Sequence, residues 1–450
     1  MATAEYGRSL RVGVASIDIT PAVGVSMQGY ELRHAAGITD PLLASALAVG
    51  SDTLEWLLLS VDVIGLDRRF TGRVRKTLAN SLALRSSAIT IACSHTHSGP
   101  ATLSRLGVVP SEDSYLTFLH KQLTAVAETA ANSLQDVRWR FGTELLPQNV
   151  NRRIKTLGGV KLGTDPKGPV DSRLRVIRID RMAGFAGSSP LALIVHYACH
   201  ATCSGGVPSI SADWPGAMRA ALQSTYGSED PPIVCFVQGC TGDVTHRIAR
   251  DRELWPEHFG QHTSVQSGIL GRLAAATAFD ASERSVEFPA EALDVITEPL
   301  LLPFHDHFGS EETEMQLLRI GPLATCANSS QHSVWIVGLP AEPFTAYSTG
   351  LGDCFQRQLG VECESVMVCG YINDLVGYLC TPEALREGGY EASVAHHFYH
   401  RPSPFSVATQ SLVFDRILGA AGRIGVSKQV PVSWYHAWLN GFGHRRSTVG

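Results

Sequence analysis

Short apolar runs alternate with longer amphipathic stretches along most of the chain. The apolar runs are rich in β-branched residues and are bounded by Gly, Pro, Asp or Ser, which is typical of strands. They lie at residues 11–16, 42–49, 55–63, 88–94, 139–148, 174–180, 192–197, 233–238, 333–339 and 364–371. The amphipathic stretches repeat apolar positions at the spacing of one helix face. They lie at residues 69–82, 112–134, 213–225, 265–281, 344–359 and 406–418.

This order of elements predicts an α/β fold, because strands and helices alternate through roughly the first 280 residues. We find no internal repeat and no low-complexity linker, so we expect one domain over residues 1–450. The stretch at residues 158–168 is short, polar and rich in glycine. It is interpreted as a surface loop near a site.

Composition and charge narrow the class of protein. The chain is 44% hydrophobic and 18% charged, as expected of a globular protein with a large core. Its net charge of -5 argues against a nucleic-acid partner, since phosphate binding needs a basic surface. No apolar run reaches the roughly 18–20 residues that span a bilayer, and the N-terminus lacks a secretory pattern. We therefore expect a cytoplasmic protein without a membrane span, and a homo-oligomer remains possible.

The strongest chemical feature is ITIACSHTHSGP at residues 89–100, where an apolar strand leads into two histidines. Side chains at positions i and i+2 of an extended chain point the same way, so His95 and His97 can meet one metal ion or one substrate. The end of a strand is also where α/β sheets bind ligands. The alternative is a pair of surface histidines in a loop.

A second apolar run, at residues 192–197, also ends near histidines. His196 lies inside the run, which favours a hydrogen-bonded core histidine. His200 follows the run and precedes small residues, so it is the better candidate for a metal ligand. None of the ten cysteines forms a C-x-x-C pair, which argues against a thiolate zinc site.

Two further runs end in polar turns. One opens into a glycine-rich turn with Asp243 and Thr245, whose backbone N–H groups suit an oxyanion. The alternative is a tight turn that Asp243 caps. The other run precedes Glu342, which could serve zinc as an oxygen ligand or favour the start of a helix.

Other histidines lie in polar, less regular surroundings, and we do not expect them to bind metal. They are His258 and His262, His305 and His307, and the group at residues 396–400. The chain also lacks the G-x-S-x-G, H-E-x-x-H, Walker A and G-x-G-x-x-G signatures.

Taken together and in order, these segments resemble the catalytic domain of the neutral ceramidases. The resemblance rests on GVASIDITPAVGVSMQGY, GITDPLLASALAV, LLLSVDVIGL, SHTHSGP and NVNRR, followed by the later segments, and covers about residues 11–392. It implies a mixed-sheet zinc hydrolase domain. It also implies that the immunoglobulin-like domain found at the C-terminus in that family is absent here.

The resemblance also implies a set of site residues. Matched motif by motif, one zinc ion would be held by His95, His200, Glu342 and Tyr378. Substrate-facing or transition-state groups would be His97, Arg152 and Tyr390. Thr245 stands where the family has an active-site serine, and Asp243 precedes it; both would orient water or substrate.

The implied reaction is hydrolysis of an N-acyl type, non-peptide amide bond in a small molecule by zinc-activated water. His97, Arg152 or Tyr390 would hold the oxyanion, and His97 would protonate the departing amine. The change from serine to Thr245 and the absent C-terminal domain lead us to expect a relative that is not itself a ceramidase. The alternatives are an ester or lactone hydrolase, a binding protein that has lost turnover and, less favoured, a metal-dependent phosphoesterase.

Overall fold

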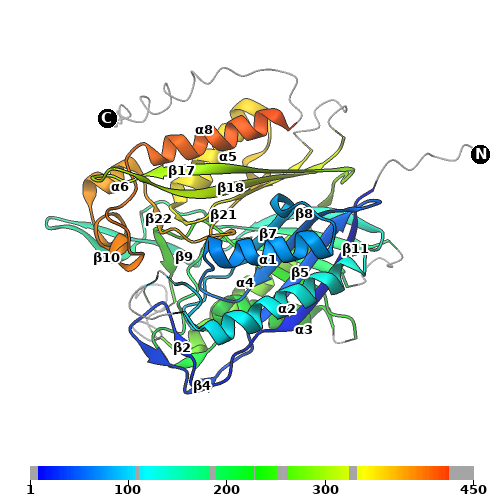
Figure 1. Ribbon diagram of the computed structural model, residues 1–450, viewed down its shortest axis with the longest axis horizontal. Coiled ribbons are helices and arrows are strands. Elements are labelled where there is room, and N and C mark those ends of the chain that lie inside the picture. Colours follow the sequence, from blue (N-terminus) through cyan, green and yellow to red (C-terminus); the bar gives the residue numbers. More distant parts are fainter. Residues whose placement is uncertain are drawn as a thin grey trace, which may run out of the picture.

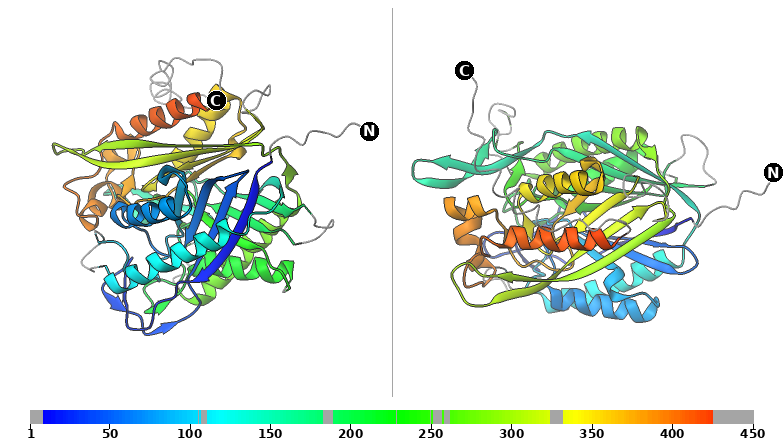
Figure 2. Two further views of the ribbon diagram at one scale, coloured as in Figure 1. Left: turned by 45° about the vertical axis from the view of Figure 1, so that its right-hand side comes forward. Right: turned by 90° about the horizontal axis from the view of Figure 1, so that it is seen from above.

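The computed structural model describes residues 9–104, 106, 111–182, 189–227, 229–248, 250, 257, 262–323 and 332–424. It has a mixed α/β fold with three main sheets, each covered by helices on its outer face (Figures 1 and 2). The six predicted helices and ten predicted strands are all present, with ends shifted by a few residues. None of the helices in this part of the chain is long and apolar enough to cross a membrane.

The first sheet has the order β1-β5-β6-β7. Its strands are β1 (Arg11–Asp18), β5 (Leu43–Gly50), β6 (Leu54–Val61) and β7 (Ile89–Cys93). β6 and β7 run parallel, and the other pairs are antiparallel. Helices α1 (Arg68–Ser81) and α2 (Asp113–Ala131) cover its outer face.

The second sheet has the order β14-β12-β11-β8-β16. Its strands are β8 (Val137–Leu145), β11 (Arg173–Arg181), β12 (Ala192–Tyr197), β14 (Ile233–Gln238) and β16 (Val286–Glu287). β12 and β14 are parallel. Helices α3 (Asp213–Tyr226) and α4 (Ser264–Glu283) pack on it.

The third sheet has the order β17-β18-β19-β21. Its strands are β17 (Ala292–Pro303), β18 (Ser310–Gly321), β19 (Val334–Gly338) and β21 (Val366–Cys369). β19 and β21 are parallel. Helices α5 (Thr345–Leu359) and α8 (Thr409–Arg423) lie along its outer face (Figure 2).

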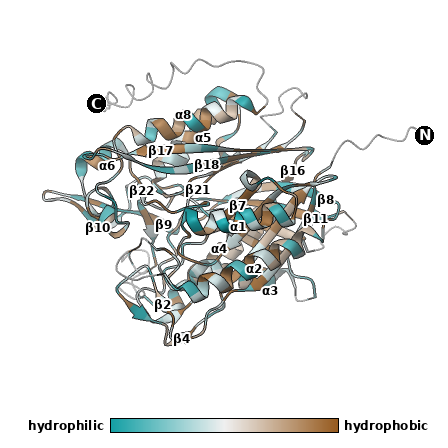
Figure 3. Cartoon of the chain, in the orientation of Figure 1, coloured by the Kyte–Doolittle hydropathy of each residue, from teal (hydrophilic) through white to brown (hydrophobic). Residues whose placement is uncertain are grey.

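The inner faces of the three sheets meet in one central core. In β6, Leu57 and Leu59 face α1 and α2, whereas Trp56 and Leu58 face the centre. The central core joins these residues to side chains from β11, β12, β14, β18, β19 and β21. Both faces of the inner strands are thus buried, which is why their sequences are continuously apolar (Figure 3).

Shorter elements connect the sheets and border the site. They are β2 (Ser26–Met27), β3 (Arg33–His34), β4 (Gly37–Ile38), β9 (Asn149–Thr156), β10 (Gly159–Asp165), β13 (Ser209–Ile210), β15 (Val244–His246), β20 (Glu342–Pro343), β22 (Tyr378–Leu379), α6 (Pro382–Glu387) and α7 (Ala395–Phe398). A short π-helix, Tyr390–Val394, leads into α7. The prediction of a loop at residues 158–168 was wrong, because most of this stretch forms β10. This strand is half-buried or exposed and pairs with β9 in an antiparallel hairpin.

Candidate metal centre

His95 and His200 each follow the end of a parallel strand. His95 lies two residues beyond β7, and its backbone has a φ of 62°, an uncommon left-handed conformation for a residue with a side chain. Hydrogen bonds from the backbone N–H groups of Ser94 to Val61 and of His95 to Val63 fix this turn. His200 follows β12, so the two histidines come from different sheets.

The imidazoles of His95, His97 and His200 converge. The Nε2 atom of His95 lies 3.1 Å from Nε2 of His200 and 3.1 Å from Nε2 of His97. In each ring the Nδ1 atom contacts a backbone carbonyl oxygen, which can only accept a hydrogen bond. The acceptors are Ile64 for His95 (2.6 Å), Gly29 for His97 (3.0 Å) and Thr241 for His200 (3.2 Å). Each Nδ1 therefore carries the proton, and three Nε2 lone pairs face one another.

Glu342 completes a compact triangle with two of these nitrogens. Its Oε2 atom lies 3.4 Å from Nε2 of His95 and 3.7 Å from Nε2 of His200. Ligands of a tetrahedral zinc ion with bonds of about 2.0–2.1 Å are separated by about 3.3 Å, so these edges fit a zinc ion. Among the described residues, the three histidines are the one group of His, Cys, Asp or Glu side chains with metal-binding spacing.

The protonation states suit a cation. Burial raises the pKa of Glu342, but His95, Arg152 and a hydrogen bond from Tyr399 outweigh it and lower that pKa to about 2. Burial, with Arg152 and the other histidines, lowers the pKa of His200. Burial and His95 lower the pKa of His97 to about 3. A carboxylate and neutral imidazoles are the forms that bind metal.

Two tyrosines hold Glu342, and no pattern in the sequence predicted either role. The ring of Tyr371 stacks on His95 with centroids 4.1 Å apart, and its hydroxyl donates to Oε2 of Glu342 at 3.2 Å. The hydroxyl of Tyr399 donates to Oε1 of the same carboxylate. Residues 370–399 contain four tyrosines, and their spacing does not reveal which of them turn toward Glu342.

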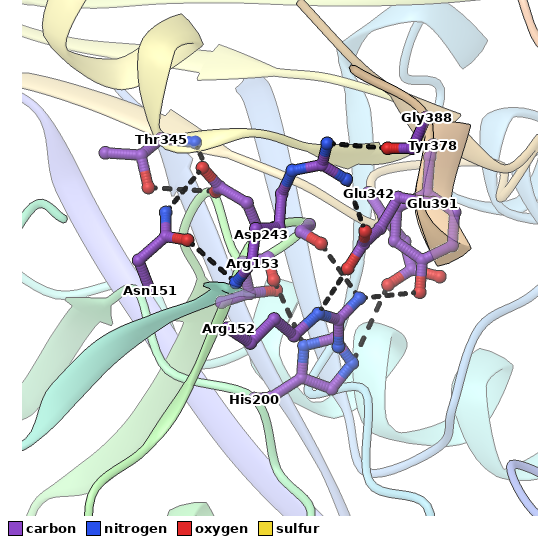
Figure 4. Close-up of polar contacts among 12 residues, drawn as sticks. Asn151, Arg152, Arg153, His200, Asp243, Glu342, Thr345, Tyr378, Gly388 and Glu391 are labelled. Carbon is purple, nitrogen blue, oxygen red and sulfur yellow. Dashed lines mark hydrogen bonds and ion pairs between the residues drawn. The ribbon is translucent and has the colours of Figure 1, made fainter. Parts of the chain in front are cut away.

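Tyr378 and Arg152 lie together beside this carboxylate (Figure 4). The short strands β20 and β22 pair Glu342 with Tyr378. Arg152 donates to the Tyr378 hydroxyl at 3.1 Å, to the Gly242 carbonyl at 2.8 Å and to Glu391 at 2.8 Å. Arg152 is thereby fixed close to the histidines, while Tyr378 lines the adjoining cavity.

Asp243 and Thr245 are buried next to β9. The Asp243 carboxylate accepts hydrogen bonds from the backbone and hydroxyl of Thr345, at 2.7 and 3.0 Å, and from Asn151 at 3.1 Å (Figure 4). Burial raises the pKa of Asp243 to about 6. Thr245 is buried in β15, opposite Val150 of β9. Neither residue is part of the cavity lining.

A cavity of about 510 Å³ opens onto the histidines. Its lining includes His95, His97, Glu342, Tyr378, Tyr390 and Tyr399, with Leu32, Ile64, Leu106 and Phe398 as apolar neighbours. A second cavity of about 470 Å³ has a charged lining that includes Asp67, Arg68, Glu311 and Arg401. Tyr399 contributes to both linings.

The other described histidines do not belong to this metal-binding group. The Nε2 atom of His196 bonds to the Val368 carbonyl at 3.0 Å inside the core, which confirms the core assignment. His305 and His307 are exposed and belong to no metal-binding group among the described residues. His262 contacts His246, whereas His258 lies outside the described residues.

Comparison with known proteins supports the fold. Neither a protein-family model nor the sequence of a curated protein matches the chain. Two solved structures are similar: neutral ceramidase from Pseudomonas aeruginosa, with a TM-score of 0.74 at 16% identity, and a ceramidase complexed with C2, with 0.73 at 16%. The matches cover 95% and 94% of this chain and 77% of each ceramidase chain. This chain has the fold of the neutral ceramidases over nearly all of its length.

Proposed function

We propose that this protein is a zinc-dependent hydrolase that cleaves an amide bond, of the N-acyl type, in a small molecule. The observation that carries the proposal is the triangle formed by His95, His200 and Glu342, whose edges fit a zinc ion. The fold shared with neutral ceramidases supports an amide as the substrate. Tyr378, next to Glu342 across the β20–β22 pair, is the proposed fourth ligand.

Zinc, when bound, supplies an activated water, whose pKa falls from about 15.7 to near 7, and polarises the scissile carbonyl. His97 lines the cavity and is neutral, because burial and His95 lower its pKa, so we assign it the acceptance of a proton from the attacking water and the transfer of that proton to the departing amine. Tyr390 lines the same cavity and can donate a hydrogen bond to the developing oxyanion. Arg152 holds the Tyr378 hydroxyl, and Asp243 accepts hydrogen bonds from Thr345, three residues after Glu342. Thr245, buried in β15, is proposed to act only through its packing against β9.

The test is the metal content of the purified protein, measured by elemental mass spectrometry. We expect about one zinc ion per chain in the wild type and in the control His307→Ala, whose side chain is exposed. We expect His200→Ala to have lost it. Absence of metal from the wild type, even after zinc is supplied, would refute the site.

A panel of amides and matched esters then separates the possible reactions, because the same zinc site attacks both kinds of carbonyl. Faster hydrolysis of the amides supports the proposal. Faster hydrolysis of the esters would assign the protein to the ester or lactone hydrolases. A zinc-loaded protein that cleaves neither would be a binding protein on a retained fold.

A further inference from the structure

A group of cationic side chains lies around Tyr30, at one edge of the cavity. Tyr30 lines the cavity, and its ring meets that of His97 edge-on, with centroids 5.3 Å apart. The guanidinium carbon of Arg33 lies 5.0 Å from the centre of the Tyr30 ring. One Arg33 nitrogen donates to the His97 carbonyl, but its Nε and Nη1 atoms are buried without a partner.

A second set of free donors surrounds His246. This residue is fully buried, and neither ring nitrogen has a partner that meets hydrogen-bond geometry. The ring of His262 lies edge-on at 6.0 Å, and its Nδ1 atom is also unpartnered. The turn at Gly205 and Gly206 joins the two groups, because a Cβ atom at Gly205 would lie 2.6 Å from His262 and one at Gly206 would lie 4.0 Å from the Tyr30 ring. Arg250 lowers the pKa of both histidines, and its buried Nε atom has no partner.

Asp213 is an acidic group beside this cluster, and its carboxylate is already occupied by other donors. Asp213 acts on Tyr30 and on His262, but its carboxylate accepts three backbone hydrogen bonds. The donors are the N–H groups of Cys203 (3.2 Å), Ser204 (2.8 Å) and Trp214 (2.7 Å). Buried donors without acceptors destabilise a fold, so their presence here indicates a missing acceptor.

We propose that Arg33, Arg250 and His246 form an anion subsite, which binds a carboxylate or phosphate group of the substrate at the Tyr30 edge of the cavity. This inference rests on the proposed function and deepens it: the substrate is an amide that carries a negative charge. Guanidinium and imidazole N–H groups make strong, charge-assisted hydrogen bonds to such oxygens. A neutral substrate would leave these donors unpaired.

The test compares zinc-loaded wild type, Arg250→Gln and the control Arg272→Gln, whose side chain is exposed on α4. The substrates are N-lauroylglycine, its uncharged twin N-lauroylglycinamide, and N-lauroyl phosphoethanolamine. The readout is the ratio of kcat/KM between charged and uncharged substrates, because effects on the shared zinc machinery cancel in a ratio. We expect the wild type and Arg272→Gln to favour a charged substrate at least about tenfold, and Arg250→Gln to lose that preference. The better of the two charged substrates identifies the anion as carboxylate or phosphate.

The outcomes separate this subsite from the hydrolase itself. If the protein hydrolyses charged and uncharged amides equally well, the proposed subsite is overturned but the proposed hydrolase activity is not. The same conclusion follows if both Arg250→Gln and Arg33→Gln keep the preference for a charged substrate. If no amide is cleaved, calorimetric titration with the same glycine pair decides. Tighter binding of N-lauroylglycine that Arg250→Gln abolishes supports the subsite without the hydrolase, and equal or absent binding overturns it.

Discussion

Tyr371 and Tyr399 each hold one oxygen of Glu342, so the carboxylate is oriented before any ion arrives. Groups that bond to a metal ligand typically change metal affinity by 10–100-fold when they are removed. Tyr371 contributes twice, since its ring also stacks on His95. These contacts depend on where two side chains turn in three dimensions, which no spacing in the sequence could reveal.

Tyr371→Phe should weaken zinc binding by about tenfold or more, because it removes the hydroxyl and keeps the stacked ring. Competition with a chromogenic chelator measures the affinity. The matched control is Tyr115→Phe, which removes a buried hydroxyl bonded to the Ile19 carbonyl, away from the site. Equal zinc affinity in Tyr371→Phe and wild type would contradict a role for this hydroxyl.

His196 should make the fold sensitive to acid. Burial and Arg175 lower its pKa in the folded chain to about 3. As the pH falls below the usual value near 6.5, the unfolded chain binds a proton that the folded chain refuses, so stability is lost between about pH 6.5 and 3.

In His196→Gln this loss should disappear, while the amide can still donate to the Val368 carbonyl. Urea unfolding of zinc-free protein should show that the stability gap between wild type and variant shifts by about 1–2 kcal/mol in favour of the variant from pH 7 to pH 5. The control is His34→Gln, an exposed side chain. Parallel pH profiles for wild type and His196→Gln would refute the assignment.

At the scale of elements, the strand ends explain why the sequence predicted so much of the site. His95 and His200 follow β7 and β12, and Glu342 follows β19 by four residues. Each of these strands pairs in parallel with a neighbour and is buried on both faces, so its apolar run was unmistakable. A polar residue just beyond such a run stands out.

The longest elements that the sequence did not predict form two hairpins with weak hydrophobic patterns. In the hairpin of β9 and β10, β9 is mostly buried but β10 is half-buried or exposed throughout, so β10 carries no apolar face that would mark it as a strand. In the hairpin of β17 and β18, the first half of β18 is rich in glutamate and threonine, and β17 contains Pro299. Its pairing to β19 and packing to α8 decide its structure, and these are tertiary contacts.

Ion pairs between β9 and the π-helix Tyr390–Val394 allow a test of how elements are held together. Glu391 is fully buried and pairs with both Arg152 and Arg153, at 2.8 and 2.7 Å. Glu391→Ala leaves two buried guanidinium groups without their partner, so it should lower the free energy of unfolding by about 3–5 kcal/mol.

The control joins nearly the same elements at the surface. Glu383 pairs with Lys155 at 3.4 Å, and both side chains are more than half exposed. Glu383→Ala should cost no more than about 1 kcal/mol, since water screens the pair. Chemical denaturation measures both variants, and equal losses would show that the buried ion pair has no special role.

At the scale of the whole molecule, the candidate site joins all three sheets. His95 follows the first sheet, His200 the second, and Glu342 the third. An ion held by all three ligands binds only the folded chain, so it stabilises the entire assembly. At a zinc concentration one hundred times the dissociation constant, the gain is about 2.7 kcal/mol.

Zinc should therefore raise the thermal unfolding midpoint of metal-free protein by a few degrees, as one shifted transition. Differential scanning fluorimetry measures this shift. Magnesium at the same concentration should have no comparable effect, because it prefers an octahedron of oxygen ligands. A zinc response that persists in His200→Ala would place the ion elsewhere.

Tyr399 lines both the cavity at the histidines and the charged cavity next to it, and its hydroxyl is bonded to Glu342. A molecule that binds in the charged cavity and displaces the Tyr399 ring must also break the hydrogen bond from Tyr399 to the Glu342 carboxylate of the candidate metal centre. Binding at the two sites is then linked. Zinc would change the affinity of the protein for that ligand by the same factor by which the ligand changes the affinity of the protein for zinc. Among the described residues, Tyr399 is the one that lines both cavities, so a single side chain couples two sites with different chemistry.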